Sequence, residues 1–113
     1  MYPMITKQKY QLYKKQAEVV QAVAHPLRIA ILYFLADGPQ CVCDIAEHIG
    51  SERSNVSRHL AVMLNAGLLE QRKEGLKVIY KVKTPCLFKF LSCVSGVLKE
   101  QIEDSKKLAK MLE

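Results

Sequence analysis

The stretch CVCDIAEHIGSERSNVSRHLAVMLNAG, residues 41–67, decides the fold of this 113-residue chain. It holds a short segment of helical apolar spacing that ends at Gly50 and a longer one that ends at Gly67. A glycine directly after such a segment is typical of a helix end, because glycine adopts the left-handed backbone conformation at little cost. We therefore expect two helices joined by the short turn IGSERS, which is the arrangement of a helix-turn-helix.

The second of these helices has the composition of a DNA-reading helix. Val56, Leu60 and Leu64 are expected on its inner face, with Ser51 or Ser54 as its N-cap. Its outer side is expected to carry short polar or cationic side chains suited to base edges and phosphates: Arg53, Ser54, Asn55, Ser57, Arg58 and His59. Arginine can pair with guanine through two hydrogen bonds and asparagine with adenine. The prediction is that this helix enters the major groove of DNA.

A change of period follows the two helices. LLEQRKEGLKVIYKV, residues 68–82, alternates apolar and charged positions around Glu74-Gly75, which predicts a two-stranded hairpin. Residues 51–83 contain seven lysines and arginines against three acidic residues, and the whole chain has a formal charge of +6. A basic hairpin directly after a reading helix is a wing, and its expected DNA contacts are Arg72, Lys73 and Lys77.

Amphipathic helices are expected on both sides of this unit. Residues 7–24 have helical apolar spacing, Pro26 opens a second helix that stops at Gly38-Pro39, and residues 86–112 form one long helix. The fold class is mainly α with a small β-hairpin wing, in the order α-α-α-α-β-β-α. We expect one domain over residues 1–113, with the DNA-reading unit at about 41–83. The apolar stripes of the outer helices are large for so short a chain, which predicts a homodimer built on them.

Other classes of protein are disfavoured by the same sequence. No apolar run approaches the ~20 residues of a membrane span, and no signal peptide opens the chain, so we expect a cytoplasmic protein. His25, His48 and His59 have no carboxylate at an informative spacing, and no glycine-rich phosphate loop is present. We therefore expect no enzyme.

Four segments together resemble the ArsR/SmtB family of metal-sensing winged-helix repressors. They are HPLRIAILYFLADG, CVCDIAEHIG, SNVSRHLAVMLNAGLL and RKEGLKVIYKV, and the resemblance covers roughly residues 20–83. It implies a homodimer that represses a promoter until an inducer binds. A dimer of this kind is expected to read double-stranded operator DNA with an inverted repeat, whose half-sites lie about one helical turn apart.

Cys41 and Cys43 are the expected inducer ligands. The family's arsenic, antimony, cadmium and lead sensors are similar at this point, with Cys-Val-Cys-Asp at the start of the third helix. On a regular helix, residues i and i+2 point in nearly opposite directions, so the two thiols can share one ion only if the first turn is extended or frayed. A helix N-terminus also favours the thiolate that binds soft metals.

The remaining thiols, Cys86 and Cys93, leave the inducer open. With Cys41 and Cys43 they could complete a three-sulfur site for As(III) or Sb(III), or a tetrathiolate site for Cd, Pb or Zn. Thiols from two segments could instead form a disulfide or polysulfide bridge, as in persulfide- or oxidant-sensing members of the fold. Cys86 and Cys93 could also be core packing, and the protein could be a DNA binder with no small-molecule inducer. As(III) or Sb(III) is our preferred inducer.

Overall fold

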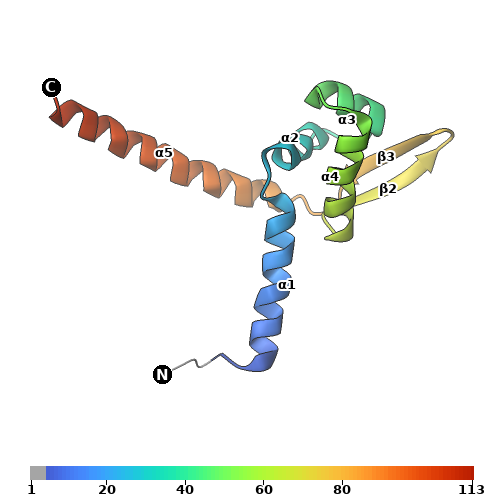
Figure 1. Ribbon diagram of the computed structural model, residues 1–113, viewed down its shortest axis with the longest axis horizontal. Helices are drawn as coiled ribbons and strands as arrows, with labels where there is room; N and C mark the ends of the chain where they lie inside the picture. Colours follow the sequence, from blue (N-terminus) through green and yellow to red (C-terminus); the bar gives the residue numbers. More distant parts are fainter. Residues whose placement is uncertain (1–4) are drawn as a thin grey trace. The chain divides into compact units, whose positions relative to one another are not determined.

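The computed structural model describes residues 5–113, which fall into two compact units. The first ends at Lys83 and the second spans Thr84–Glu113. Figure 1 shows the elements in chain order: α1 (Lys7–Val23), α2 (Pro26–Leu35), β1 (Gln40–Cys41), α3 (Val42–Ile49), α4 (Arg53–Asn65), β2 (Leu69–Glu74), β3 (Lys77–Val82) and α5 (Leu87–Met111). The predicted winged helix-turn-helix is confirmed, with one strand more than expected.

Helices α1 and α2 begin where the sequence predicts. The Thr6 side chain accepts a hydrogen bond from the Lys9 backbone N–H, and Pro26 occupies the first turn of α2. His25 precedes it as N-cap, and its Nδ1 accepts from the Leu27 N–H at 3.1 Å. The two helices are bent by 80° relative to each other. Of α1 only Ala22 and Val23 are buried, so nearly its whole length is exposed.

The helix-turn-helix is closed by a glycine turn. Gly50 ends α3 with a φ of 72°, and the N–H groups of Gly50 and Ser51 both donate to the Ala46 carbonyl. This left-handed cap satisfies the Ala46 carbonyl, one of the groups that a helix end would otherwise leave unpaired. The expected cap of α4 at Ser51 or Ser54 is wrong, because Glu52 holds the N-cap position without a side-chain hydrogen bond.

The wing is part of a three-stranded antiparallel sheet with strand order β1-β3-β2. Strands β2 and β3 pair from Leu69↔Val82 to Glu74↔Lys77, and Gly75 turns the hairpin with a φ of 63°. The additional strand β1 pairs Gln40 with Tyr80 and Cys41 with Ile79. A two-residue strand is too short to show an alternating pattern, which is why the sequence did not predict it.

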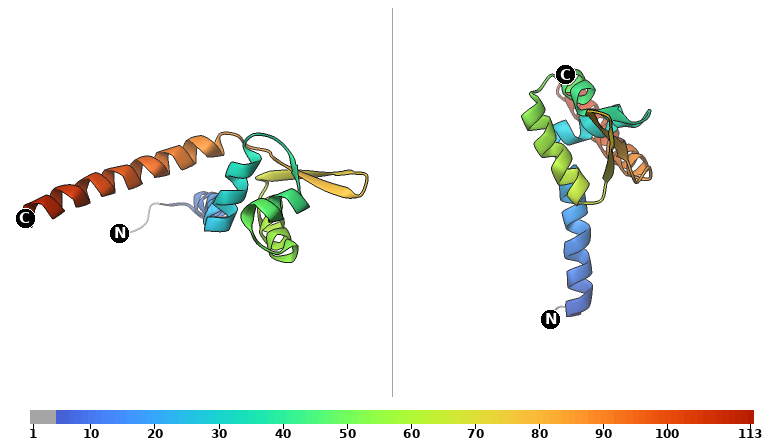
Figure 2. Two further views of the ribbon diagram at one scale, coloured as in Figure 1. Left: turned by 90° about the horizontal axis from the view of Figure 1, so that it is seen from above. Right: turned by 90° about the vertical axis from the view of Figure 1, so that its right-hand side faces the viewer.

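The core of the first unit lies where α2, α3 and α4 meet, as the two views of Figure 2 allow the reader to follow. Its largest fully buried side chains come from all three helices: Ile31, Leu32, Ile45, Val56, Leu60 and Met63. Each such side chain contributes about 1.5–3 kcal/mol by leaving water. The core therefore holds α3 and α4 in a defined geometry, and these helices carry both candidate sites.

The second unit is essentially the helix α5, 25 residues long. Leu91 is buried, whereas Phe90, Val94, Val97, Leu98 and Ile102 are between 41% and 57% exposed. Within residues 5–113, no single helix is long and apolar enough to cross a membrane, and α1 with α2 reaches that length and composition only as a bent pair.

Candidate DNA interface and thiol site

Most of the predicted reading residues lie on the exposed face of α4. Arg53, Ser54, Ser57 and Arg58 are exposed, and Asn55 is half-buried. Val56 and Leu60 point into the core, so the helical period separates the two faces as expected. The structure therefore brings five of the six predicted residues of this helix to an accessible surface.

Asn55 has two hydrogen-bonding partners within the protein. Its Nδ2 donates to Ser51 Oγ at 2.8 Å, and its Oδ1 accepts from Arg58 Nη2. These bonds connect the turn before α4 to the arginine at its centre. Pairing of Asn55 with adenine would require both groups to be released, whereas Arg58 keeps further N–H donors for a guanine.

His59 is the exception, and its predicted place on the outer side is wrong. It is 9% exposed, and its Nδ1 accepts a hydrogen bond from Arg28 Nε at 3.1 Å. The His25 ring lies 4.4 Å away, centroid to centroid. Burial lowers the pKa of His59, and the charges of His25, Arg28 and Arg58 lower it further. The helical period could have predicted this, since residue 59 stands three after the buried Val56.

The wing presents the expected cations. Arg72, Lys73 and Lys77 are all exposed, and Arg72 Nε pairs with Glu74 Oε1 at 3.1 Å. A second pair joins Lys81 to Glu70 at 3.9 Å. Exposed ion pairs of this kind contribute about 0–1 kcal/mol, so a phosphate can compete with them for the cation. The hairpin thus offers positive charge to a nucleic-acid backbone.

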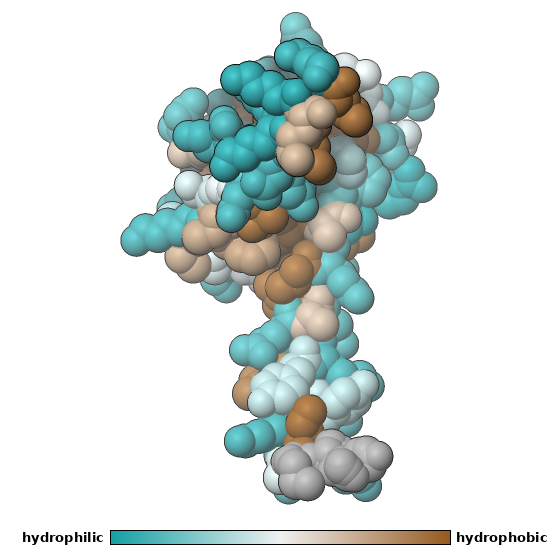
Figure 3. All heavy atoms as spheres, turned by 90° about the vertical axis from the view of Figure 1, so that its left-hand side faces the viewer, coloured by the Kyte–Doolittle hydropathy of each residue, from teal (hydrophilic) through white to brown (hydrophobic). Residues whose placement is uncertain are grey.

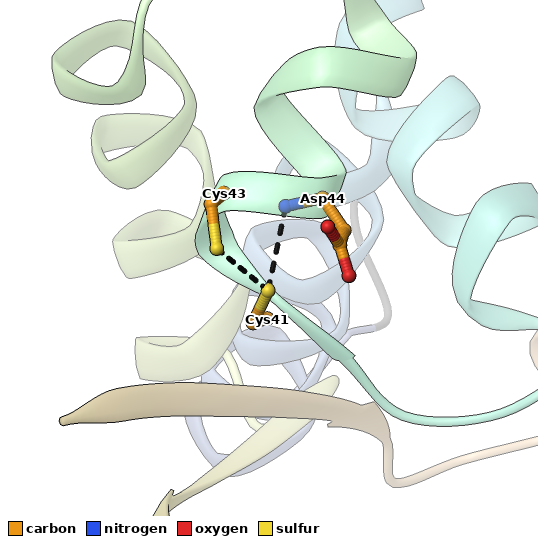
Figure 4. Close-up of side chains that lie close together, drawn as sticks. All are labelled: Cys41, Cys43 and Asp44. Atoms are coloured by element: carbon orange, nitrogen blue, oxygen red, sulfur yellow. Dashed lines mark hydrogen bonds between the residues drawn. The ribbon is translucent and has the colours of Figure 1, made fainter. Parts of the chain in front are cut away.

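The two thiols of the CVCD segment lie together at the start of α3 (Figure 4). Cys41 is the N-cap of α3 in extended conformation, with φ −82° and ψ 159°. Its Sγ accepts from the Asp44 N–H at 3.4 Å and lies 2.8 Å from Cys43 Sγ. The prediction that an extended first turn brings residues i and i+2 together is confirmed, and both sulfurs can reach one bound atom.

The two thiols differ in acidity. A hydrogen bond from the Cys41 thiol lowers the pKa of Cys43, with smaller contributions from the Asp44 N–H and the charge of Arg53. The same interaction raises the pKa of Cys41, and burial adds to the rise, since this side chain is only 4% exposed. Cys43 is therefore the thiol that ionises first and is the better nucleophile of the pair toward a soft ion.

Asp44 adds a third donor to the pair. One atom from each of Cys41, Cys43 and Asp44 lies within 4.8 Å of the others, and within residues 5–113 no other group of three or more such ligands is found. Two sulfurs and one oxygen form a set that favours thiophilic ions over Mg²⁺ or Ca²⁺. The carboxylate was not among the predicted ligands, although it stands in the quoted CVCD segment.

A cleft of about 340 Å³ opens beside the thiols. The start of α3, the start of α4 and the tip of the hairpin line it: Cys41, Val42, Cys43, Arg53, Leu76, Lys77 and Val78. The hairpin's part in this cleft was not predicted from the sequence. Strand β1, which contains Cys41, pairs with β3 of the hairpin, and no sequence pattern indicates this pairing.

Cys86 and Cys93 belong to the second unit. Both are free and exposed, Cys86 as the residue before α5 and Cys93 within it. Their predicted alternative as core packing is not seen in the isolated chain. Whether they join the Cys41–Cys43 pair remains a prediction.

Helix-turn-helix, wing and basic surface together define a DNA-binding protein of the winged-helix class. A family model described as "Bacterial regulatory protein, arsR family" matches residues 25–71. An uncharacterized HTH-type transcriptional regulator of Mycobacterium tuberculosis, Rv0081, is 34% identical over 94 residues, which are 82% of each chain. This chain belongs to the ArsR family of transcriptional regulators.

Structural and sequence comparisons agree with this family. The crystal structure of Rv0081 has a TM-score of 0.72, with 82% of this chain and 94% of that chain covered. The homodimeric winged helix-turn-helix domain of Mb0332 from Mycobacterium bovis is 28% identical, with a TM-score of 0.75 and 91% and 95% coverage. The arsenical resistance operon repressor of Staphylococcus xylosus is 30% identical over 70 residues, or 62% of this chain and 67% of that one.

Proposed function

We propose that the protein is a homodimeric repressor that leaves its operator when Cys41 and Cys43 bind a thiophilic metalloid, As(III) or Sb(III). The observation that carries the proposal is the pair of sulfurs 2.8 Å apart at the N-terminus of α3. Binding of one atom by both sulfurs needs no rearrangement of the backbone, because Cys41 is already extended there. The arsenical repressor among its relatives supports this class of inducer.

The thiols lie close to α4, so inducer binding there can affect the residues that we expect to contact DNA. Helix α3 is joined to the reading helix α4 by a three-residue turn, and Arg53 at the start of α4 lines the cleft beside the thiols. A ligand held there changes the surroundings of a residue that we expect to contact DNA. Useful regulation requires a coupling of about 1–3 kcal/mol between inducer and operator, which one displaced cation or a small helix shift can supply.

The choice of inducer follows from ligand softness. Thiolates are soft donors that bind trivalent arsenic and antimony, and Asp44 adds a harder oxygen that Cd, Pb or Zn would also accept. Cys86 and Cys93 could supply a third sulfur. We therefore rank the metalloids first and the divalent ions second. No catalytic role is proposed, and we expect the protein in the cytoplasm, where thiols stay reduced.

The DNA partner is proposed to be an inverted repeat read by two copies of α4. The expected contacts are Arg53, Ser54, Asn55, Ser57 and Arg58 in the major groove, with Arg72, Lys73 and Lys77 on the backbone. Two-fold symmetry of the protein would then be matched by two-fold symmetry of the operator.

The test is an operator-binding titration followed by fluorescence anisotropy with As(III), Sb(III), Cd, Pb, Zn and a polysulfide. It compares wild type, Cys41→Ser/Cys43→Ser and the matched control Cys86→Ser/Cys93→Ser. We expect As(III) or Sb(III) to release wild type and to leave the first double variant on the DNA. If neither double variant is released by As(III) or Sb(III), the inducer site is composite and uses thiols of both pairs. If only the polysulfide releases wild type, the protein is a redox sensor. A Cys41→Ser/Cys43→Ser variant that responds like wild type overturns the proposal.

A further inference from the structure

The turn of the wing holds a large apolar side chain in water. Gly75 and Leu76 form a two-residue loop between β2 and β3, because Glu74 pairs with Lys77 on either side of it. Leu76 is 106% exposed, more than any other large apolar side chain of residues 5–113. No protein atom covers it, so this leucine does not contribute to the packing of the hairpin.

The backbone of the turn makes the leucine more unusual. Gly75 has a φ of 63°, and within residues 5–113 only glycines have a positive φ, so Leu76 has a negative one. A positive φ followed by a negative one is the pattern of a type II′ turn, which connects antiparallel strands tightly. Asparagine, aspartate or serine commonly follows the glycine of such a turn. Here a leucine takes that place, at the end of a short and defined loop.

Cations lie on both faces of the hairpin next to this turn. Lys77 is paired with Glu74, and the preceding residue of β2, Lys73, is paired with Val78. Because successive side chains of a strand point to opposite faces, the two lysines lie on opposite faces. Both are exposed, and Glu74 is ion-paired with Arg72 at 3.1 Å. A tip with a cation on each face is complementary to a DNA groove, which has a row of phosphates on each side.

The hairpin is long enough to reach the groove next to the one that α4 is expected to read. Its strands have six residues each, which span about 20 Å in extended conformation. Figure 1 shows the hairpin extending beyond the helices, with its turn at the free end. Neighbouring major and minor grooves are about half a helical turn apart, or roughly 17 Å. With α4 in the major groove, the turn can therefore reach an adjacent minor groove.

We propose that Leu76 is an apolar wedge that enters the minor groove of the operator and partly unstacks the base step that it contacts. The inference rests on the proposed operator binding and names a further residue for it. Leucine is one of the side chains that proteins insert between base pairs, and the faces of the bases are the apolar surface that DNA offers. The lysines contact phosphates and Leu76 contacts bases, so the two kinds of residue have separable effects.

A wedge of this kind gives the wing a preference for deformable DNA. Pyrimidine–purine steps such as TA unstack at a lower cost than other steps. A guanine also places an amino group in the minor groove, where an adenine has none. Leu76 therefore favours a TA step at the position where the turn meets the DNA.

The probe is a duplex selected from random DNA with the wild-type protein. Its adenines are replaced one at a time by 2,6-diaminopurine, which adds an amino group in the minor groove and leaves the major-groove edge of the pair unchanged. Affinity is measured by fluorescence anisotropy. We expect the affinity of wild type to fall about five-fold or more at a short run of adjacent positions. In Leu76→Ser the same replacements should change the affinity by less than about two-fold.

Three variants separate the wedge from the charge of the wing. On the unmodified duplex, Leu76→Ser should lower the affinity about ten-fold and leave the slope of log affinity against log salt unchanged, because no charge is removed. Leu76→Met keeps a large apolar side chain and should keep both the affinity and the diaminopurine response. Lys77→Ala should reduce the salt slope and keep the diaminopurine response.

Equal diaminopurine responses in wild type and Leu76→Ser overturn the inference and leave operator binding by α4 standing. A Leu76→Ser protein that sediments as a smaller species in the absence of DNA also overturns it, because the leucine would then lie between two copies of the chain. If the wild-type protein selects no duplex, the proposed function itself fails.

Discussion

His59 is a buried polar side chain in a helix whose other residues divide into a core face and an exposed face. Its Nδ1 accepts from Arg28, which also lies 3.5 Å from the Ala22 carbonyl at the end of α1. The arginine thereby joins α1, α2 and α4. This arrangement requires a neutral imidazole, because a protonated Nδ1 would be a donor facing a guanidinium.

The lowered pKa of His59 makes stability pH-dependent. The unfolded chain takes up this proton near pH 6.5, whereas the folded protein resists it to lower pH. Acid therefore favours unfolding. The free energy of unfolding decreases as the pH falls from about 6.5 to the pKa of His59 in the folded protein. The free energy of unfolding, measured with urea, should fall between about pH 7.5 and about pH 5.5. The fall should be larger in wild type than in His59→Gln. His48→Gln, at an exposed histidine of α3, should behave as wild type, and an equal loss in all three proteins would exclude His59 as the source.

Arg58 is the residue on which we expect base reading to depend most. It is exposed near the middle of α4, and its bond to Asn55 orients the guanidinium before DNA arrives. Arg58→Ala should weaken operator binding by about 1–3 kcal/mol and relax base preference at one position. Anisotropy with operators carrying each base at every position measures both effects. Full affinity in this variant would mean that another face of α4 reads the DNA.

Among the elements, the hairpin is expected to contribute charge through its lysines, which add no sequence preference. Lys77 stands at the first residue of β3, exposed and opposite Glu74. Lys77→Ala should weaken binding to all sequences alike and reduce the slope of log affinity against log salt by about one. Lys99→Ala on α5 is a control of equal charge outside the DNA-reading unit. A selective loss on one operator sequence would instead indicate base contact by Lys77.

The elements also show what the sequence could and could not predict. The ends of α3 and α4 were predictable because Gly50 and Gly67 follow clear periodic segments. Strand β1 was not, because two residues have no period, and the cleft that depends on its pairing was missed with it. His59 was assigned to the wrong face although its spacing from Val56 was available. From the sequence, Cys41 and Cys43 could be expected to lie close together only if the first turn of the helix were extended. Cys41 is an extended N-cap, so this condition is met.

On the scale of the whole molecule, the exposed apolar side chains of α1 and α5 lead us to expect that a second copy of the chain packs against them. Figure 3 shows apolar side chains interrupting the hydrophilic surface of α1, and on α5 the side chains of Val94, Val97, Leu98 and Ile102 are more than 40% exposed. Exposed apolar side chains repeated along a helix often mark an interface, and a protein of similar fold is homodimeric.

We therefore expect Leu98→Glu to shift the protein from dimer to monomer in sedimentation velocity at micromolar concentration. Operator affinity should fall with it, because a monomer reads one half-site. Lys99→Glu, the neighbouring residue on α5, serves as the control for added negative charge. A dimer that persists in Leu98→Glu would remove α5 from the interface, and a wild-type monomer bound one-to-one to DNA would overturn the dimer altogether.

The N-cap role of Cys41 has a genetic consequence. Serine is among the preferred N-cap residues, and its hydroxyl can accept the Asp44 N–H that the sulfur accepts here. Exchange of this one side chain for serine should therefore cost the fold little and leave α4 in place while removing one of the two proposed inducer ligands. A single Cys41→Ser substitution would then give a repressor that stays bound to its operator in the presence of the inducer, so selection for constant silencing of the target genes would need only one step.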